Sequence, residues 1–382
     1  MSVPAEYRLV LTTDTGSRLA NPFNPIGSGF KATRKANTIS PITVELPYNY
    51  DHRVFTVTVS HPIEYMIQVW RKADGGTMKL FNTYIITEFE RHASPTPNGK
   101  VILGGWDMNL LLYRRIVAAY AASANARITD YADDMIKGLM TDAQSDVIAP
   151  VPTAGTRAWP NLTVAGDVSK GPSITLDLEY QKLLTFAGGG AFKKITNASQ
   201  EAGTDLFFEV QPNLVLENSI NFILNTFTTQ IGQDLTDSVT LSRENSTIEN
   251  AVSRYSYGKA MNYIYAGGKG QDDARTISQA YDATEYGRGI WARSEGFKDV
   301  PSVDDASLQN EADAFLQDSK RLVEFKGSIV DTAQIRYGRD YDFGDLVTAK
   351  AWGDQFDAMI SAVTVGMRDG RDIVDVKAEY RL

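Results

Sequence analysis

Three histidines are the first candidates for chemistry in this chain of 382 residues, because imidazole is a common metal ligand. His52, His61 and His92 all fall in the first β-rich segment, and side chains from neighbouring strands could together bind a metal. However, His61 precedes Pro62 and His92 precedes a turn, where surface histidines are common. We therefore interpret all three as surface residues.

Three aspartates form the second candidate. Asp340, Asp342 and Asp345 place three carboxylates in one short segment, and clustered carboxylates could surround calcium. Their spacing departs from the calcium-loop pattern, so we favour a turn with solvated acids. A pair of carboxylates for glycoside cleavage stays open, because 47 acidic residues offer many pairs and only geometry selects one.

Two glycine clusters could cradle a phosphate on free backbone amides. Gly188–Gly190 lacks the dinucleotide-binding spacing and is better explained as a loop that enters a helix. Gly267–Gly270 contains Lys269, but no Ser or Thr follows that lysine to hold magnesium, which favours a hairpin tip. The metalloprotease, nucleophile-elbow and P-loop motifs are absent from the sequence. We therefore predict no enzymatic activity and no catalytic, cofactor-binding or metal-binding residues.

Charge and composition exclude further classes of protein. The chain has 38 Lys and Arg against 47 Asp and Glu, a net charge of −9, which disfavours a protein that coats nucleic acid. It contains no cysteine, so disulfides and thiolate metal sites are excluded. The most apolar stretch, 108–122, is too short to span a bilayer and carries two arginines. We expect a soluble protein without stable membrane insertion and without an export signal of its own.

The first part of the chain predicts strands and turns. At 54–59 apolar residues alternate with threonine, the period of two of a half-buried strand. Asp74-Gly75-Gly76 lies between two apolar runs and predicts a tight hairpin. A third strand is expected at 100–106.

The middle of the chain changes to a helical period. Asp107 is expected to cap a helix whose apolar stripe contains Leu112, Ile116, Ala119 and Tyr120. A second helix, capped by Thr129 or Asp130, carries a stripe of Ala132, Met135, Ile136, Leu139 and Met140, which we interpret as core. The Pro- and Gly-rich stretch 147–172 predicts a surface loop. A helix at 191–202, ended by Gly203, then leads into a strand at 206–211.

The last part returns to strands, interrupted by a helical excursion at about 271–326. Strands are expected at 254–257, 261–265, 329–337, 345–352, 359–365 and 373–380, and Asp369-Gly370 predicts a hairpin between the last two. The predicted fold class is α+β. It comprises an antiparallel β-barrel-like domain at 1–106, an α/β middle domain at 107–215 and a second barrel domain at 216–382 with the helical insertion.

The order of these segments resembles the tail-hub proteins of long-tailed bacteriophages, in the siphovirus tail protein family. The resemblance rests on four segments in sequence order, across roughly residues 5 to 382. They are GGWDMNLLLYRR at 104–115, AFKKI at 191–195 leading to GTDLFFEV at 203–210, SVTLSREN at 238–245, and the helix near Leu308 followed by YDFGDLV at 341–347.

The resemblance implies a structural virion protein at the distal tail tip, made in the host cytoplasm. Three copies would form a ring whose two barrels per copy mimic six-fold symmetry and close the end of the tail tube. Implied partners are the distal tail or tail-tube ring, the tape-measure protein and a tail-tip fibre or spike protein, with DNA only in transit. The family supplies no catalytic residues, and we expect no appended enzymatic domain. The stretch 147–172 fits the family poorly.

Two other functions remain as alternatives. One is a β-rich module of the virion that binds a receptor or glycan through exposed aromatics, although an aromatic content of 10% is ordinary. The other is a tail-associated glycosidase, which needs two carboxylates roughly 5 to 10 Å apart in a cleft.

Overall fold

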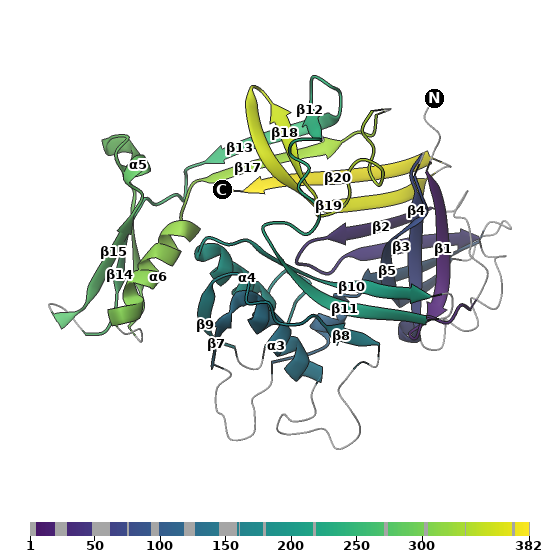
Figure 1. The fold of residues 1–382 in the computed structure, drawn as a ribbon, viewed down its shortest axis with the longest axis horizontal. Coiled ribbons are helices and arrows are strands. Elements are labelled where there is room, and N and C mark those ends of the chain that lie inside the picture. The colour runs from purple at the N-terminus through teal and green to yellow at the C-terminus, as the bar shows by residue number, and fades with distance from the viewer. Residues whose placement is uncertain are drawn as a thin grey trace, which may run out of the picture.

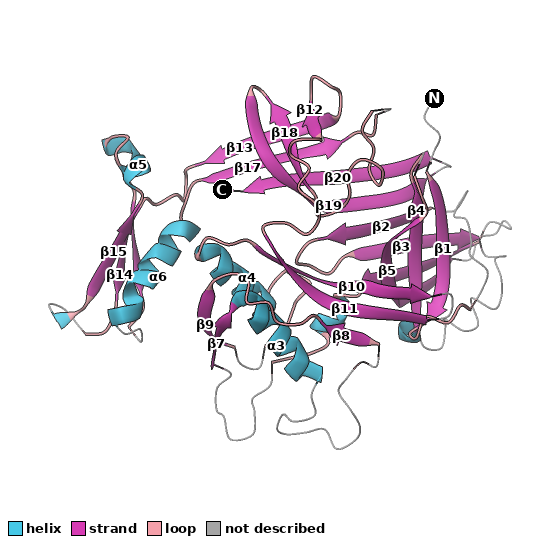
Figure 2. Ribbon diagram, viewed as in Figure 1, coloured by secondary structure: helices cyan, strands magenta, loops and turns pink. Residues whose placement is uncertain are grey.

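The computed structural model describes residues 5–19, 29–47, 62–74, 76–92, 99–117, 127–144, 159, 161–178, 181–216, 219–270, 274–301, 305–332, 334–368 and 371–381. These residues are mostly strands, with a smaller number of helices (Figure 2), which agrees with the predicted α+β class. Within the described ranges no helix is both long and apolar enough to cross a membrane.

Six strands near the N-terminus pair antiparallel in the order β1-β4-β5-β6-β3-β2. They are β1 Glu6–Thr13, β2 Phe30–Lys35, β3 Pro41–Pro47, β4 Tyr65–Lys72, β5 Lys79–His92 and β6 Lys100–Asp107, and the short 3-10 helix η1 Pro62–Glu64 precedes β4. In β3, buried Ile42, Val44 and Leu46 alternate with more exposed neighbours, the pattern of a half-buried strand. The β4–β5 hairpin and β6 confirm two predictions, whereas the strand expected at 54–59 lies outside the described residues.

Six further strands come from the C-terminal part and pair in the order β12-β18-β19-β20-β17-β13. Their bounds are β12 Thr240–Ser242, β13 Ile248–Ser256, β17 Leu322–Ile329, β18 Leu346–Ala351, β19 Asp354–Arg368 and β20 Arg371–Arg381. The last three confirm the strands expected at 345–352, 359–365 and 373–380. The predicted strand at 329–337 is wrong beyond Ile329. There Asp331 accepts a hydrogen bond from the backbone N–H of Tyr337 and Thr332 accepts one from Ile335, so local turns replace a ladder.

The two ends of the chain meet at the pairing of β2 with β19, where Phe30–Lys35 lies opposite Ala362–Met367. This ladder joins both sets of six into one twelve-stranded sheet (Figure 1). One hydrophobic cluster runs through both sets and includes Leu9, Val44, Phe325 and Val363. Among the described strands no ladder closes either set into a barrel, because β2 pairs with β3 and β19 and not with β1.

The middle of the chain packs against one side of this sheet. Its elements are α2 Leu110–Tyr113, β7 Arg127–Tyr131, α3 Ala132–Gln144, β8 Leu162–Val164, β9 Ser173–Asp177, α4 Ala191–Glu201, β10 Leu206–Leu216 and β11 Ser219–Thr228. The predicted apolar stripe of α3 is buried and belongs to a second hydrophobic cluster with Phe192 and Phe208. Gly203, with φ +86°, follows α4 in the left-handed conformation that glycine favours after a helix.

Three expectations for this middle part are corrected. The helix after Asp107 ends at Tyr113, because Ile116 forms a bridge with Lys182 instead of continuing the turn. Thr129 and Asp130 lie in β7 and therefore do not cap α3. The stretch expected as a loop at 147–172 contains β8, which pairs with β11. The three-part division into domains stays a prediction, and the β10–β11 hairpin spans the expected boundary at 215.

A small lobe stands apart from the twelve-stranded sheet at the left of Figure 1. It contains β14 Tyr263–Gly267, β15 Ile277–Tyr281, α5 Ala283–Tyr286, the 3-10 helix η3 Ile290–Ala292, β16 Glu295–Asp299 and α6 Asp305–Asp318. The strands β15, β14 and β16 form a separate sheet within the lobe. The α6 helix packs on this small sheet through Leu308, Ala312 and Leu316, which form a third cluster with Ile264 and Ala266. The helical insertion expected at about 271–326 therefore also contains β15, β16 and the beginning of β17. Gly267–Gly270, expected as a hairpin tip, lies at the end of β14, which pairs antiparallel with β15.

Candidate functional site

Of the residues considered as possible metal ligands, the structure describes His92, Asp340, Asp342 and Asp345. His92 lies on the exposed end of β5, where its ring lies 3.0 Å from a carboxylate oxygen of Glu90. His52 and His61 lie outside the described residues. Within the described part of the chain, no group of three His, Asp or Glu side chains is arranged to hold a metal ion.

The three aspartates of the second candidate site act as hydrogen-bond acceptors for nearby backbone. Asp345 accepts from the N–H groups of Gln233 and Asp342, at 2.7 and 2.6 Å. Asp340 accepts from the backbone of Arg336 at 2.7 Å. The prediction of a turn therefore holds, but Asp345 is buried rather than solvated, and burial raises its pKa. The carboxylates are used to fix the loop.

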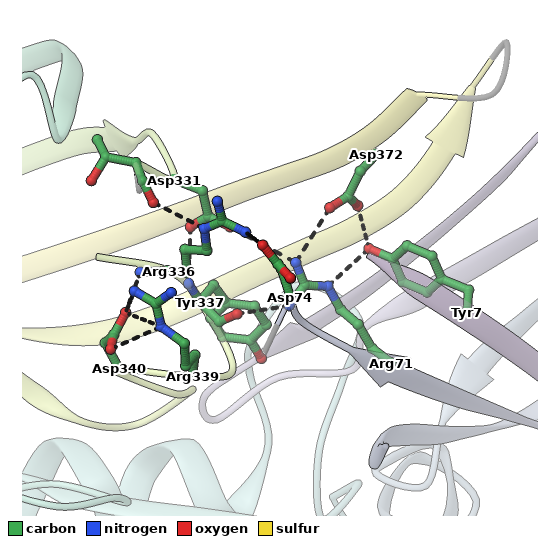
Figure 3. Close-up of polar contacts among 10 residues, drawn as sticks. Tyr7, Arg71, Asp74, Asp331, Arg336, Tyr337, Arg339, Asp340 and Asp372 are labelled. Atoms are coloured by element: carbon green, nitrogen blue, oxygen red, sulfur yellow. Dashed lines mark hydrogen bonds and ion pairs between the residues drawn. The ribbon is translucent and has the colours of Figure 1, made fainter. Parts of the chain in front are cut away.

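A buried polar junction, which sequence analysis missed, joins the two ends of the chain where β4, β1 and β20 approach one another (Figure 3). Its centre is Arg71, a side chain that is only 6% exposed. Arg71 donates to the Tyr7 hydroxyl at 3.0 Å and to the Tyr337 carbonyl at 2.8 Å. The same guanidinium lies 3.4 Å from Asp372 and 3.8 Å from Asp331, so one cation contacts two carboxylates.

A second arginine extends this junction toward the β4–β5 hairpin. Arg336 is buried and pairs with Asp74 at 2.7 Å, while its Nε donates to the carbonyl of Thr332. Arg339 pairs with Asp340 next to it (Figure 3). The loop that follows β17 is thus bound to the N-terminal strands by charge-assisted hydrogen bonds, which are about twice as strong as neutral ones.

Arg71 and Tyr7 at the centre of the junction are each held in one protonation state near neutral pH. Burial raises the pKa of the Tyr7 hydroxyl far above its ordinary value, so it stays protonated. Burial alone would lower the pKa of Arg71, but Tyr7 and Asp372 more than offset it and the pKa is raised. Burial also raises the pKa of Asp331. A permanently charged arginine and a permanently protonated tyrosine serve as structural groups rather than as an acid or base near neutral pH.

A second buried ion pair connects the sheet to the middle part. Arg34 in β2 donates from Nε and Nη2 to the two carboxylate oxygens of Glu209 in β10, each at 2.7 Å. The guanidinium also lies 4.4 Å from the centroid of the Phe343 ring. This bidentate geometry fixes the position of β10 relative to β2.

The sequence does contain a signal for both arginines. Arg71 shares a strand face with Ile67 and Val69, and Arg34 shares one with Phe30, all of which are core residues. An arginine on the apolar face of a strand requires a buried partner. The pattern does not identify that partner, because Glu209 and Asp372 lie far from the arginines in sequence.

A family model described as siphovirus ReqiPepy6 Gp37-like protein matches residues 55–376. The chain belongs to this family. The resemblance to siphovirus tail proteins that the sequence indicated is thereby confirmed. No curated protein is a significant sequence match to this Gp37-like chain.

Solved structures share the fold of the Gp37-like chain at low identity. The 43 kDa tail protein of prophage MuSo2 from Shewanella oneidensis matches with a TM-score of 0.55 and 10% identity, over 98% of each chain. A tail protein from Neisseria meningitidis matches with a TM-score of 0.52 and 13% identity, over 98% of this chain and 96% of that one. The Francisella PdpA–VgrG complex in its lidded form matches with a TM-score of 0.51 and 8% identity, over 100% of this chain and 53% of that one.

Proposed function

We propose that this Gp37-like protein is a structural component of the virion, a homotrimeric hub that closes the distal end of the tail tube and connects it to the tail tip or baseplate. The proposal rests on family membership and on a fold that extends over nearly the full length of two tail proteins. The two ends of the chain would act as barrel-like units, with 107–215 as a middle domain between them.

The observation that carries this proposal is the division of the large sheet. Each end of the chain contributes six strands, and the two sets meet where β2, the last strand of the first set, pairs with residues 362–367 of β19. Three copies would therefore present six β-units around a ring, which suits a tail tube built with six-fold symmetry. The buried pairs of Arg71 and Arg34 would hold each unit in a fixed orientation within its copy.

The proposed position defines the partners. One face of the ring would contact the distal tail or tail-tube protein, the other a fibre or spike protein, and the tape-measure protein would reach the hub from the tube lumen. DNA would pass through without being held, since a net charge of −9 is suited to a wall that does not retain phosphates. No chemistry is required of the hub, and we propose no cofactor and no enzymatic role.

The test is to image tails and the purified protein mixed with its tail-tube protein, and to count copies around the axis. Three copies per ring, with both six-stranded units facing the tube, are expected. The isolated chain can remain monomeric, because such a ring gains its contacts from its neighbours. One copy or six copies at the distal end would refute the hub, and a lumen lined by arginine and lysine would refute the account of DNA passage.

A further inference from the structure

The neck of the lobe contains a cavity that the hub function does not use. Its volume is about 640 Å3, and it lies where β13 leads into β14 and where α6 returns to β17. A volume of this size falls within the range of about 300 to 1,000 Å3 that is typical of small-ligand sites. Its wall carries both a large aromatic side chain and several charges, so it is neither a purely apolar gap nor a plain solvent channel.

Two aromatic side chains line the cavity, Tyr257 and Trp291. The Tyr257 hydroxyl accepts a hydrogen bond from Arg321, whereas Trp291 on η3 is 99% exposed. An indole that gains nothing from burial in its own fold is unusual, because tryptophan is highly buried on average. It presents a flat apolar face beside the cavity, with the N–H of the ring available as a donor. The C–H face of a sugar ring fits such a platform.

The backbone that follows Trp291 is held in place by one buried amide side chain, that of Asn262. Asn262 donates from Nδ2 to the carbonyl of Ala292 at 2.6 Å and accepts at Oδ1 from the N–H of Ser294 at 2.9 Å. Both polar ends of this side chain therefore fix the backbone that follows η3. Asp282 caps α5 by accepting from two backbone N–H groups, which fixes a second segment of the lining. The site is largely formed without a ligand.

The charges at the cavity are mainly positive, in a chain that is negative overall. Six charged side chains line it: Asp282, Glu285, Arg288, Arg293, Lys320 and Arg321. Glu285 pairs with Arg288 at 3.1 Å and lies 3.6 Å from Arg321. Arg293 stacks on Tyr286 at 4.6 Å, and neither it nor Lys320 has an ion pair with any described residue. Both are exposed, so two cations are free to bind an anion.

We propose that this cavity binds a saccharide that bears a carboxylate or phosphate, with a sugar ring on Trp291 and the anionic group on Arg293 and Lys320. A protein partner is a poorer fit, because Asp, Glu and Lys are depleted at the centres of protein interfaces, and Asp282, Glu285 and Lys320 line this cavity. Single-stranded nucleic acid is also a poorer fit, since Asp282 and Glu285 would repel a continuous phosphate backbone. The inference does not depend on the trimer, and it gives the glycan-binding alternative a defined location.

The binding test uses the purified full-length chain on a panel of neutral, uronate-bearing and phosphate-bearing oligosaccharides, together with a single-stranded DNA oligonucleotide. Binding confined to anionic saccharides and weakened by added salt is expected. Trp291→Ala should weaken binding about tenfold or more, as for loss of a stacking platform. The double variant Arg293→Gln/Lys320→Gln should remove the preference for anionic saccharides.

A matched control removes another exposed tryptophan. Trp352 is 56% exposed at the β18–β19 turn and has φ +53°, so Trp352→Gly suits the backbone and leaves the cavity intact. The Trp352→Gly control should bind like the native protein. Ligand should change the tryptophan fluorescence of the native protein and of Trp352→Gly, but not that of Trp291→Ala. No binding to any anionic saccharide, stronger binding of the oligonucleotide, or equal binding by the Trp291→Ala variant would overturn the proposal.

Discussion

The pair between Arg34 and Glu209 allows a direct test of how the middle part is fixed to the sheet. Glu209→Leu removes the carboxylate and leaves the guanidinium of Arg34 among Phe343 and core residues without a counter-ion. The side chains of Arg34 and Glu209 are 19% and 6% exposed, so water cannot fully replace the lost partner. Burial alone would lower the pKa of Arg34, but Glu209 more than offsets it and raises the pKa, so the charge remains when the carboxylate is present.

The expected cost follows from this burial and from the bidentate contact at 2.7 Å on both oxygens. Removing one partner of a buried pair costs about 3 to 5 kcal/mol. The exposed pair of Lys100 with Glu45, at 3.2 Å, is the matched control, because both side chains are more than 40% exposed. Glu45→Gln should cost no more than about 1 kcal/mol, the usual limit for surface pairs.

The assay is the free energy of unfolding from denaturant titration, followed by far-ultraviolet circular dichroism and by tryptophan fluorescence. Coinciding transitions would justify a single free energy. A Glu209→Leu variant that loses no more stability than Glu45→Gln would refute the claim that burial makes loss of the Glu209 carboxylate costly.

Three further predictions concern other parts of the molecule. Val376→Asp should cost several kcal/mol of unfolding free energy and give insoluble protein, because Val376 is fully buried. Asp375 is exposed, so Asp375→Ser should cost about half a kcal/mol or less. Equal tolerance of the two changes in solubility and unfolding assays would contradict the burial pattern of β20. Burial raises the pKa of Asp107, so the folded state keeps a proton on this carboxyl that the unfolded state releases as pH rises above about 4. The free energy of unfolding should therefore fall as pH rises from 4 to 8, and Asp107→Asn should make this fall smaller. An Asp107→Asn variant with the same dependence of unfolding free energy on pH would refute this. Incubating the protein with purified cell wall or polysaccharide should release no more sugar or peptide than a buffer control. Release that is abolished by changing one acidic residue would show that the protein is an enzyme.

Local patterns in the sequence were sufficient to predict the hairpins and most helices. The β4–β5 hairpin and α3 follow from residues close in sequence, where turn chemistry and apolar period decide the structure. The helix expected beyond Tyr113 was wrong, because Ile116 pairs with Lys182 and this distant contact prevails over local period. The β2–β19 ladder joins strands more than 300 residues apart, and no local pattern encodes such a pairing. The partners of Arg71 could not be predicted for the same reason.

The buried Arg34–Glu209 pair should affect the orientation of β10 relative to β2 more than it affects stability. Replacing a buried pair by apolar residues of similar volume is often neutral or stabilising, so Arg34→Met/Glu209→Leu should be clearly more stable than Glu209→Leu alone. A bidentate pair, however, allows only one geometry between β2 and β10, whereas an apolar contact tolerates small rotations. In the proposed ring each copy would have to repeat the same shape, so we expect the double variant to fold but to give fewer complete rings in particle images. Normal ring yield from a stable double variant would show that the pair does not set the orientation of the middle part.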